Sequence, residues 1–152
     1  MTATGPIGPL LALDVGTKTI GVAKCDALGL AVVPVTTLSR AGLKTDIPKV
    51  LTLVKEHRAA LVVVGLPYEL DGSERRSARI ARQVGESLVA AGVVVEYCDE
   101  RFTSVEAERS LRDAGVRPSR RAEVIDQVAA MRILESWLAE RRERERAPTP
   151  GE

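Results

Sequence analysis

The pattern of apolar and polar residues predicts three consecutive strands near the start of the chain. Residues 10–16 and 19–25 are apolar runs joined by the short turn 16–18, an arrangement typical of an antiparallel hairpin. Residues 31–38 form a third apolar run, and Pro34 within it favours the edge of a sheet because proline has no N–H to donate to a neighbouring strand. We therefore expect an antiparallel meander at the beginning of the fold.

The rest of the chain alternates between helical and strand periodicity. The segment ALVVVGLP, residues 60–67, is a continuous β-branched run, as expected of a strand buried on both faces. Thr103 followed by Glu106 forms a capping box, which predicts the start of a helix. The expected elements after the meander are a helix in 43–59, a strand in 60–67, a helix from about 74 to 91, a strand in 93–98, a helix from about 103 to 115 and a helix from about 122 to 142.

This order of elements predicts an α/β fold. A meander followed by crossover units gives a five-stranded mixed sheet with helices on both faces. We expect a single domain in residues 1–142, whereas residues 143–152 mix charges with prolines and are expected to form a disordered tail. Ligands of open α/β sheets bind beyond the carboxyl ends of the strands, so functional residues are sought there.

Composition narrows the classes of function. The 152 residues are 45% hydrophobic, enough for one core, and no apolar run approaches the roughly 18 residues of a membrane span. We expect a cytoplasmic monomer or homodimer with no membrane association. The single histidine, His57, and the separated Cys25 and Cys98 argue against a zinc site, a cysteine nucleophile and a Ser-His-Asp triad. Because the net charge is only +1, nucleic acid binding would depend on a local basic patch.

Two acidic positions lie at the ends of predicted strands. Asp14 falls within the apolar run of the first strand, where a carboxylate without a partner would be costly. Asp99 or Glu100 follows the fifth strand and reaches the same edge if the two strands are parallel neighbours at the centre of the sheet. Ordinary explanations stay open, because Asp14 could cap a turn and Glu100 could be solvated or paired with Arg101.

A third carboxylate comes from the last predicted helix. Counting in helical steps from Asp126 gives Ala130, Ile133 and Trp137. The acid therefore lies on the apolar stripe that should face the sheet, close to Asp14. The alternative is that Asp126 only complements the dipole in the first turn of its helix.

Three carboxylates in one place would repel one another unless a cation were bound. Oxygen ligands without histidine or thiolate suit Mg²⁺ or Mn²⁺. Such a cluster is a natural site for two-metal hydrolysis of a phosphodiester bond. Without the metal, we expect a raised pKa for at least one of Asp14 and Asp126.

Four motifs occur in order along the chain: LALDVGTKTIGVA, VVVGLPYELDGS, CDERFTSVEAE and VIDQVAAMRIL. Together they resemble the YqgF family, described as pre-16S rRNA nucleases and as Holliday-junction-resolvase-like proteins, over roughly residues 8–139. The resemblance implies a ribonuclease H-like fold. It also implies that the catalytic, metal-binding acids are Asp14, Glu100 and Asp126, with Asp99 as the alternative at the second position.

The candidate substrate-binding residues are basic. Gly16 and Gly21 flank Lys18, and these glycines either serve the geometry of the hairpin or let a phosphate approach while Lys18 contacts it. Three arginines crowd the entrance to the last helix, and Arg101 could touch substrate instead of pairing with Glu100. The predicted phosphate contacts are Lys18, Arg101, Arg117, Arg120 and Arg121.

The leading hypothesis is a metal-dependent endonuclease or exonuclease that processes the 5′ end of pre-16S rRNA during ribosome biogenesis. The alternative substrate is a Holliday-junction DNA. A different class of function is an ATP-binding module, because LDVGT also resembles the phosphate loop of actin-like kinases, but those proteins use two such domains and this chain has room for one. A third is a nucleic-acid-binding protein without catalysis, although 3% aromatic residues leave few platforms for base stacking.

Overall fold

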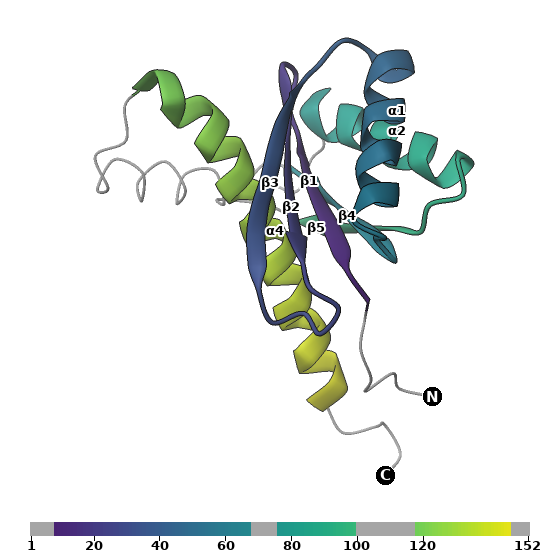
Figure 1. Cartoon of the computed structure of the whole chain (residues 1–152), viewed down its shortest axis with the longest axis vertical. Helices are drawn as coiled ribbons and strands as arrows, with labels where there is room; N and C mark the ends of the chain where they lie inside the picture. The colour runs from purple at the N-terminus through teal and green to yellow at the C-terminus, as the bar shows by residue number, and fades with distance from the viewer. Residues whose placement is uncertain (1–7, 68–75, 100–117, 147–152) are drawn as a thin grey trace.

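A five-stranded mixed sheet forms the centre of the protein (Figure 1). The structure, a computed structural model, describes residues 8–67, 76–99 and 118–146. The strands are β1 (Leu10–Val15), β2 (Thr19–Cys25), β3 (Val32–Ser39), β4 (Leu61–Leu66) and β5 (Val95–Asp99), and their order across the sheet is β3-β2-β1-β4-β5. β2 is antiparallel to both β1 and β3, whereas β4 is parallel to β1 and β5. The predicted α/β class and mixed sheet are confirmed.

The meander follows the prediction closely. β3 lies at one edge of the sheet, as expected from Pro34. The pairing of β2 with β3 shifts register between Val22 and Ala23, where Pro34 faces Ala23. β4 is buried along nearly its whole length between two neighbouring strands, as its unbroken apolar run indicated. The condition under which Asp99 or Glu100 would reach the edge of Asp14 is met only in part: β5 is parallel to β1, but β4 lies between the two strands.

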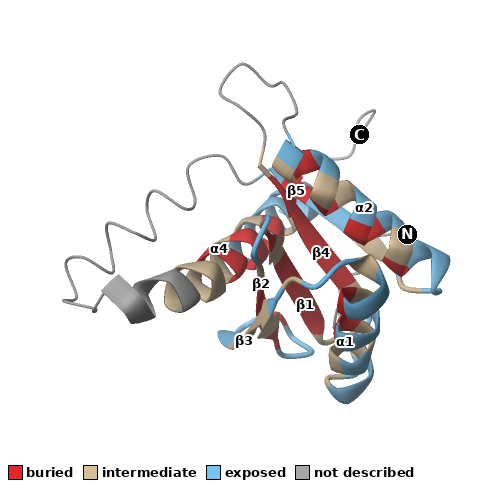
Figure 2. Ribbon diagram, turned by 90° about the horizontal axis from the view of Figure 1, so that it is seen from above, coloured by how far each residue is buried: buried red, intermediate tan, exposed pale blue. Residues whose placement is uncertain are grey.

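Helices cover both faces of the sheet, with α1 (Leu43–Glu56) and α2 (Arg76–Ala90) on one face and α4 (Pro118–Arg146) on the other. The two faces bury separate groups of side chains, and Figure 2 shows the buried residues concentrated along the inner strands. Alternate residues of β1 divide between them: Leu11 and Leu13 pack toward α1 and α2, whereas Leu10 and Ala12 pack toward α4.

Helix α4 is longer than the sequence pattern predicted. It begins at Pro118, where a proline is tolerated because the first turn has no intrahelical donor to lose, and it continues to Arg146. Residues 143–146 of the expected tail are thus helical, and an ion pair between Arg141 Nε and Glu145 Oε1 at 3.1 Å spans that last turn. The helix expected between 103 and 115 lies outside the described residues. Among the helices that are described, none has the length and apolarity needed to cross a membrane.

Side-chain hydrogen bonds fix α4 across the sheet. Gln127 Nε2 donates to Thr37 Oγ1 on β3 at 3.1 Å, and the indole N–H of Trp137 donates to Glu96 Oε1 on β5 at 3.0 Å. These contacts join the helix to both edges of the sheet. Trp137 is buried among residues of the core, as predicted.

Candidate active site

The structure brings Asp14 and Asp126 to the same face of the sheet. Asp14 is half-buried near the carboxyl end of β1, and its cross-strand partner on β2 is Gly21. Helix α4 crosses directly over that glycine: a Cβ built on Gly21 would overlap the carbonyl group of Asp126 and lie 2.9 Å from its Cβ. Since directly opposed residues of antiparallel strands have Cβ positions about 5 Å apart, the Cβ atoms of the two acids lie within about 8 Å of each other.

Gly21 has a role that the sequence interpretation did not include. Both explanations considered for it concerned the hairpin or an incoming phosphate. In the structure its missing side chain leaves the space into which the backbone of α4 fits at Asp126. This close approach is what places Asp126 beside the end of β1.

The carboxylate of Asp126 is held by the first residue of β2. Thr19 Oγ1 donates a hydrogen bond to Asp126 Oδ2 at 2.5 Å, between residues 107 positions apart in the chain. The predicted helical phase is confirmed, because Asp126 is half-buried and the residues that follow it on the stripe, Ala130, Ile133 and Trp137, are buried.

The pKa of Asp126 is raised, as expected for one of the two acids. The main cause is burial, which penalises the charged carboxylate, and the hydrogen bond from Thr19 partly opposes it. The direction is therefore the predicted one, but the cause is desolvation and not the repulsion between carboxylates on which the expectation rested.

Asp99 ends β5 at the same end of the sheet as Asp14, but on the other face. Tyr97 packs against Gly85 of α2, and Asp99 has the same parity along the strand as Tyr97. Cys98, between them, packs with the residues of α4. Asp99 therefore shares a face with α2 and not with Asp14, while Glu100 lies outside the described residues.

The turn between β1 and β2 lies at the end of the sheet that carries Asp14. Lys18 is exposed there. Next to the turn is a buried ion pair that the sequence analysis missed, in which Arg40 Nε lies 2.7 Å from Asp46 Oδ2. Arg40 also donates through Nη1 to the carbonyl of Gly16 at 2.9 Å. Arg40 lies in the polar connection from β3 to α1, where no periodicity marks it, and Asp46 lies in the first turn of α1.

The basic residues near the last helix are only partly visible. Arg101 and Arg117 lie outside the described residues. Arg120 and Arg121 belong to the first turns of α4, six and five positions before Asp126, and only their backbone is described. At 1.5 Å per residue, this places their main chain about 8 Å before Asp126 along the helix axis.

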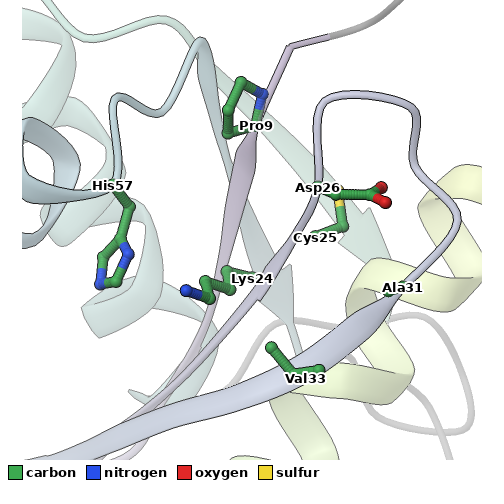
Figure 3. Close-up of a pocket in the computed structure, with 7 residues that line it drawn as sticks. All are labelled: Pro9, Lys24, Cys25, Asp26, Ala31, Val33 and His57. Carbon is green, nitrogen blue, oxygen red and sulfur yellow. The ribbon is translucent and has the colours of Figure 1, made fainter.

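A cavity of about 280 Å³ opens at the opposite end of the sheet (Figure 3). It is bounded by Pro9 just before β1, by the end of β2 and by His57, which follows the last residue of α1. Lys24 on its wall is the cross-strand partner of Leu11, three residues before Asp14. The lining residues are Pro9, Lys24, Cys25, Asp26, Ala31, Val33 and His57. The cavity shares no residue with the acidic site.

In the part of the chain that the structure describes, no group of three or more His, Cys, Asp or Glu side chains is arranged to hold a metal ion. The predicted third acid, Glu100, is not in that part.

Comparison with known proteins identifies the family. A family model described as RuvX, Holliday junction resolvase, matches residues 8–140. A Myxococcus xanthus protein assigned as a pre-16S rRNA nuclease is 48% identical over 129 residues, covering 84% of this chain and 85% of the relative. A Synechococcus elongatus protein with the same assignment is 40% identical over 142 residues, covering 91% of this chain and 93% of the relative.

Solved structures confirm the fold. Thermus thermophilus RuvC in complex with a Holliday junction substrate superposes with a TM-score of 0.52 at 17% identity, covering 88% of this chain and 95% of that one. At this identity the likeness concerns the fold alone, which is the ribonuclease H-like architecture expected from the sequence. Because the family model spans nearly the whole described core and the relatives align over most of their length, this chain belongs to the RuvX (YqgF) family of nucleases.

Proposed function

We propose that this protein is a divalent-metal-dependent nuclease that processes the 5′ end of pre-16S rRNA in the cytoplasm. The assignment of its relatives as pre-16S rRNA nucleases supports the substrate. The observation that carries the proposal is the packing of α4 on Gly21, because it puts two carboxylates from distant parts of the chain at the carboxyl end of β1. Ligands of open α/β folds bind at this end of the sheet.

The residues of this site suit Mg²⁺ or Mn²⁺. Both acids are half-buried, and one oxygen of Asp126 accepts from Thr19 while the other is left for a ligand. Carboxylate oxygens are the donors that these hard cations prefer. Asp14, Asp126 and Glu100 would hold the metal. When bound, the metal would lower the pKa of the attacking water and stabilise the leaving oxygen.

Glu100 is the better candidate than Asp99 for the second acid. Successive residues of a strand point to opposite faces, and Asp99 belongs to the face of α2. One further step of the same alternation would bring Glu100 to the face of Asp14. The phase of β5 and the family resemblance both support Glu100 as the second acid.

The remaining residues of the site bind and orient the substrate. Lys18 is exposed on the turn next to Asp14, within reach of a phosphate at the metal side of the hairpin. We assign Arg101, Arg117, Arg120 and Arg121 to phosphate contacts as well, because backbone contacts fix the register of a nucleic acid on a protein. Thr19 acts on Asp126 by fixing the orientation of its carboxylate.

The decisive experiment compares two substrates. Purified protein is incubated with a precursor rRNA 5′ leader or with a four-way DNA junction, with Mn²⁺ or with EDTA. We expect cleavage of the RNA that depends on Mn²⁺ and that Asp14→Asn abolishes. Preferential cleavage of the junction would mean that the substrate is branched DNA and not the rRNA precursor. Activity of the Asp14→Asn protein equal to that of the wild type would refute the metal site.

A further inference from the structure

We propose that Arg40 and Asp46 are positioning residues that fix the Gly16–Lys18 turn so that Lys18 meets a nucleic acid phosphate at the acidic site. The inference rests on the proposed function, since it concerns how the same site binds its substrate. Neither residue is in contact with Asp14 or Asp126 through any hydrogen bond described for the structure; both act through the backbone of the turn.

The turn is held at both of its ends by the residue that follows β3. Arg40 Nη1 donates to the carbonyl oxygen of Gly16 at 2.9 Å, and the backbone N–H of Arg40 donates to the carbonyl oxygen of Lys18 at 2.8 Å. Within the turn, the N–H of Gly16 donates to the carbonyl oxygen of Thr19 at 2.8 Å. The main chain on either side of the exposed Lys18 side chain is thus fixed by hydrogen bonds to one arginine and within the hairpin itself.

Asp46 in turn fixes Arg40. Its Oδ2 lies 2.7 Å from Arg40 Nε, and its Oδ1 accepts from the backbone N–H of Ala41 at 2.9 Å. Asp46 is 1% exposed and the Arg40 side chain 13% exposed, so the pair is shielded from competing water. Asp46 is also anchored, because its own N–H donates to the carbonyl of Gly42 at 2.8 Å in the first turn of α1.

The chemistry of arginine suits this task. The guanidinium offers a fixed fork of donors, so one side chain can pair with Asp46 through Nε and reach Gly16 through Nη1 at the same time. A lysine would have a single ammonium for both acceptors. An arginine that only stabilised α1 would need the contact to Asp46 and not the contact across to the turn.

The test uses a substitution for which the change in net charge and the displacement of the turn have opposite effects on RNA binding. Asp46→Asn makes the protein more positive, so long-range electrostatics alone would strengthen the binding of RNA. Loss of the fixed turn would weaken it, because the amide cannot accept from both Arg40 Nε and the N–H of Ala41. We therefore measure the binding of a fluorescein-labelled RNA hairpin with a single-stranded 5′ leader by anisotropy in Ca²⁺ over a series of KCl concentrations.

We expect weaker binding by Asp46→Asn, and tighter or unchanged binding would overturn the inference. A double-mutant cycle of Arg40→Gln with Lys18→Gln gives the second readout. If Arg40 acts through the turn, each single change lowers the salt slope by about 0.7, the value for one lost phosphate contact on a single strand, and the double change lowers it no further. An additive loss would mean that Arg40 itself touches the RNA, which would overturn its assignment as a positioning residue.

A third readout in the free protein separates this inference from the proposed function. Hydrogen exchange of the Gly16 and Arg40 amides, which donate the hydrogen bonds of the turn, should accelerate in Arg40→Gln and Asp46→Asn by a larger factor than that of the β4 amides, which report the loss of global stability. Arg144→Gln, an exposed arginine of the last turn of α4, is the matched control and should change neither exchange nor binding. If the wild type fails to bind RNA, the proposed function fails whatever the exchange shows; if it binds and exchange of the turn is unchanged in both variants, the inference alone fails.

Discussion

Two aspartates near the same end of the sheet differ in how their charge is balanced. Asp46 belongs to the first turn of α1, which covers one face of the sheet, and Asp126 belongs to α4, which covers the other. Burial alone would raise the pKa of Asp46, but the hydrogen bond and charge of Arg40 and the backbone N–H groups of Ala41 and Gly42 outweigh it and lower that pKa. The pKa of Asp126 is raised by burial, and only the Thr19 hydroxyl opposes the shift.

The difference separates a structural carboxylate from a candidate functional one. The protein itself neutralises Asp46, whereas among the described residues Asp126 has a hydroxyl and no cation as its partner. A half-buried carboxylate of that kind is stabilised by a cation supplied from outside, which is the condition for a metal ligand. Changes at the two sites should therefore have different consequences for the stability of the metal-free protein.

The largest effect is expected for Asp126→Asn, which should lower metal-dependent cleavage by about a thousandfold or more. The loss follows because stabilisation by a metal ion is worth several kcal/mol and each 1.4 kcal/mol is a factor of about ten in rate. The metal-free protein should be as stable as the wild type or slightly more stable, because the change removes a desolvated charge at constant volume. Cleavage assays with Mn²⁺ and urea unfolding in EDTA measure the two effects.

A matched control and a contradicting outcome are available for that variant. Glu140→Gln removes a charge from an exposed position of the same helix and should change neither quantity. A destabilisation of Asp126→Asn by more than about 1 kcal/mol would mean that its carboxylate is balanced within the protein, as that of Asp46 is.

The opposite outcome is expected for Asp46→Asn, which should cost about 3 kcal/mol of unfolding free energy. Removing one partner of a buried ion pair typically costs 3–5 kcal/mol, and the slight exposure of Arg40 places this pair at about the lower end. For a chain of this length, thermal unfolding should shift down by about 6 to 12 °C. A decrease in unfolding temperature of less than about 2 °C would mean that the Arg40–Asp46 pair contributes as little to stability as exposed ion pairs do.

Much of this architecture was predictable because it is encoded locally. The hairpin, the edge position of the strand that contains Pro34 and the inward phase of Asp126 each follow from a pattern within a few residues. The insertion of β4 between β1 and β5 was not predicted, because two parallel strands with similar apolar runs give no local sign of which one is central.

The contacts that distinguish the two aspartates could not be predicted. Thr19 and Asp126 are 107 positions apart, so their hydrogen bond exists only once α4 lies on β2. Arg40 and Asp46 are close in sequence, but Arg40 lies in a polar connection without periodicity and Asp46 lies in the first turn of α1, and both residue types are usually solvated. Gly21 offered a signal, since a glycine inside a strand often marks a close approach of another backbone.

The approach of α4 can be tested at two glycines. A Cβ at Gly21 would meet the backbone of Asp126, whereas a Cβ at Gly85 of α2 would meet the side chain of Tyr97, which is partly exposed and can move. Gly21→Ala should cost about 2 to 3 kcal/mol by overpacking and reduce cleavage, because it displaces Asp126. Gly85→Ala should change stability by less than about 1 kcal/mol, since better helix propensity offsets the contact. Equal effects in chemical denaturation would contradict this difference.

Thr19→Val should weaken metal binding by roughly 10- to 100-fold, as is typical when an outer-shell hydrogen bond to a ligand is lost. Valine keeps the shape of threonine but cannot donate to Asp126 Oδ2, so the carboxylate loses its fixed orientation. Titration of Mn²⁺ followed by calorimetry measures the affinity. Thr19→Ser retains the hydroxyl and should bind the metal almost as the wild type does; a serine variant as weak as the valine variant would point to packing as the cause.

The smallest effect is the pH dependence of stability, which should have opposite signs at the two aspartates. The pKa of Asp46 in the folded protein lies below the usual 3.8, so its contribution is complete above 3.8 and is lost as the pH falls through the folded pKa. The pKa of Asp126 lies above 3.8, so its ionisation costs stability at neutral pH, and that cost disappears as the pH falls through its folded pKa toward 3.8.

In EDTA, the unfolding free energy of Asp46→Asn should therefore stay below that of the wild type by the same amount from about pH 7 down to about pH 4. This difference should shrink only below about pH 4. The gain in unfolding free energy of Asp126→Asn over the wild type should shrink already above pH 3.8. Urea unfolding of the three proteins across this range measures both differences, and parallel curves for the two variants would mean that the two carboxylates are balanced in the same way.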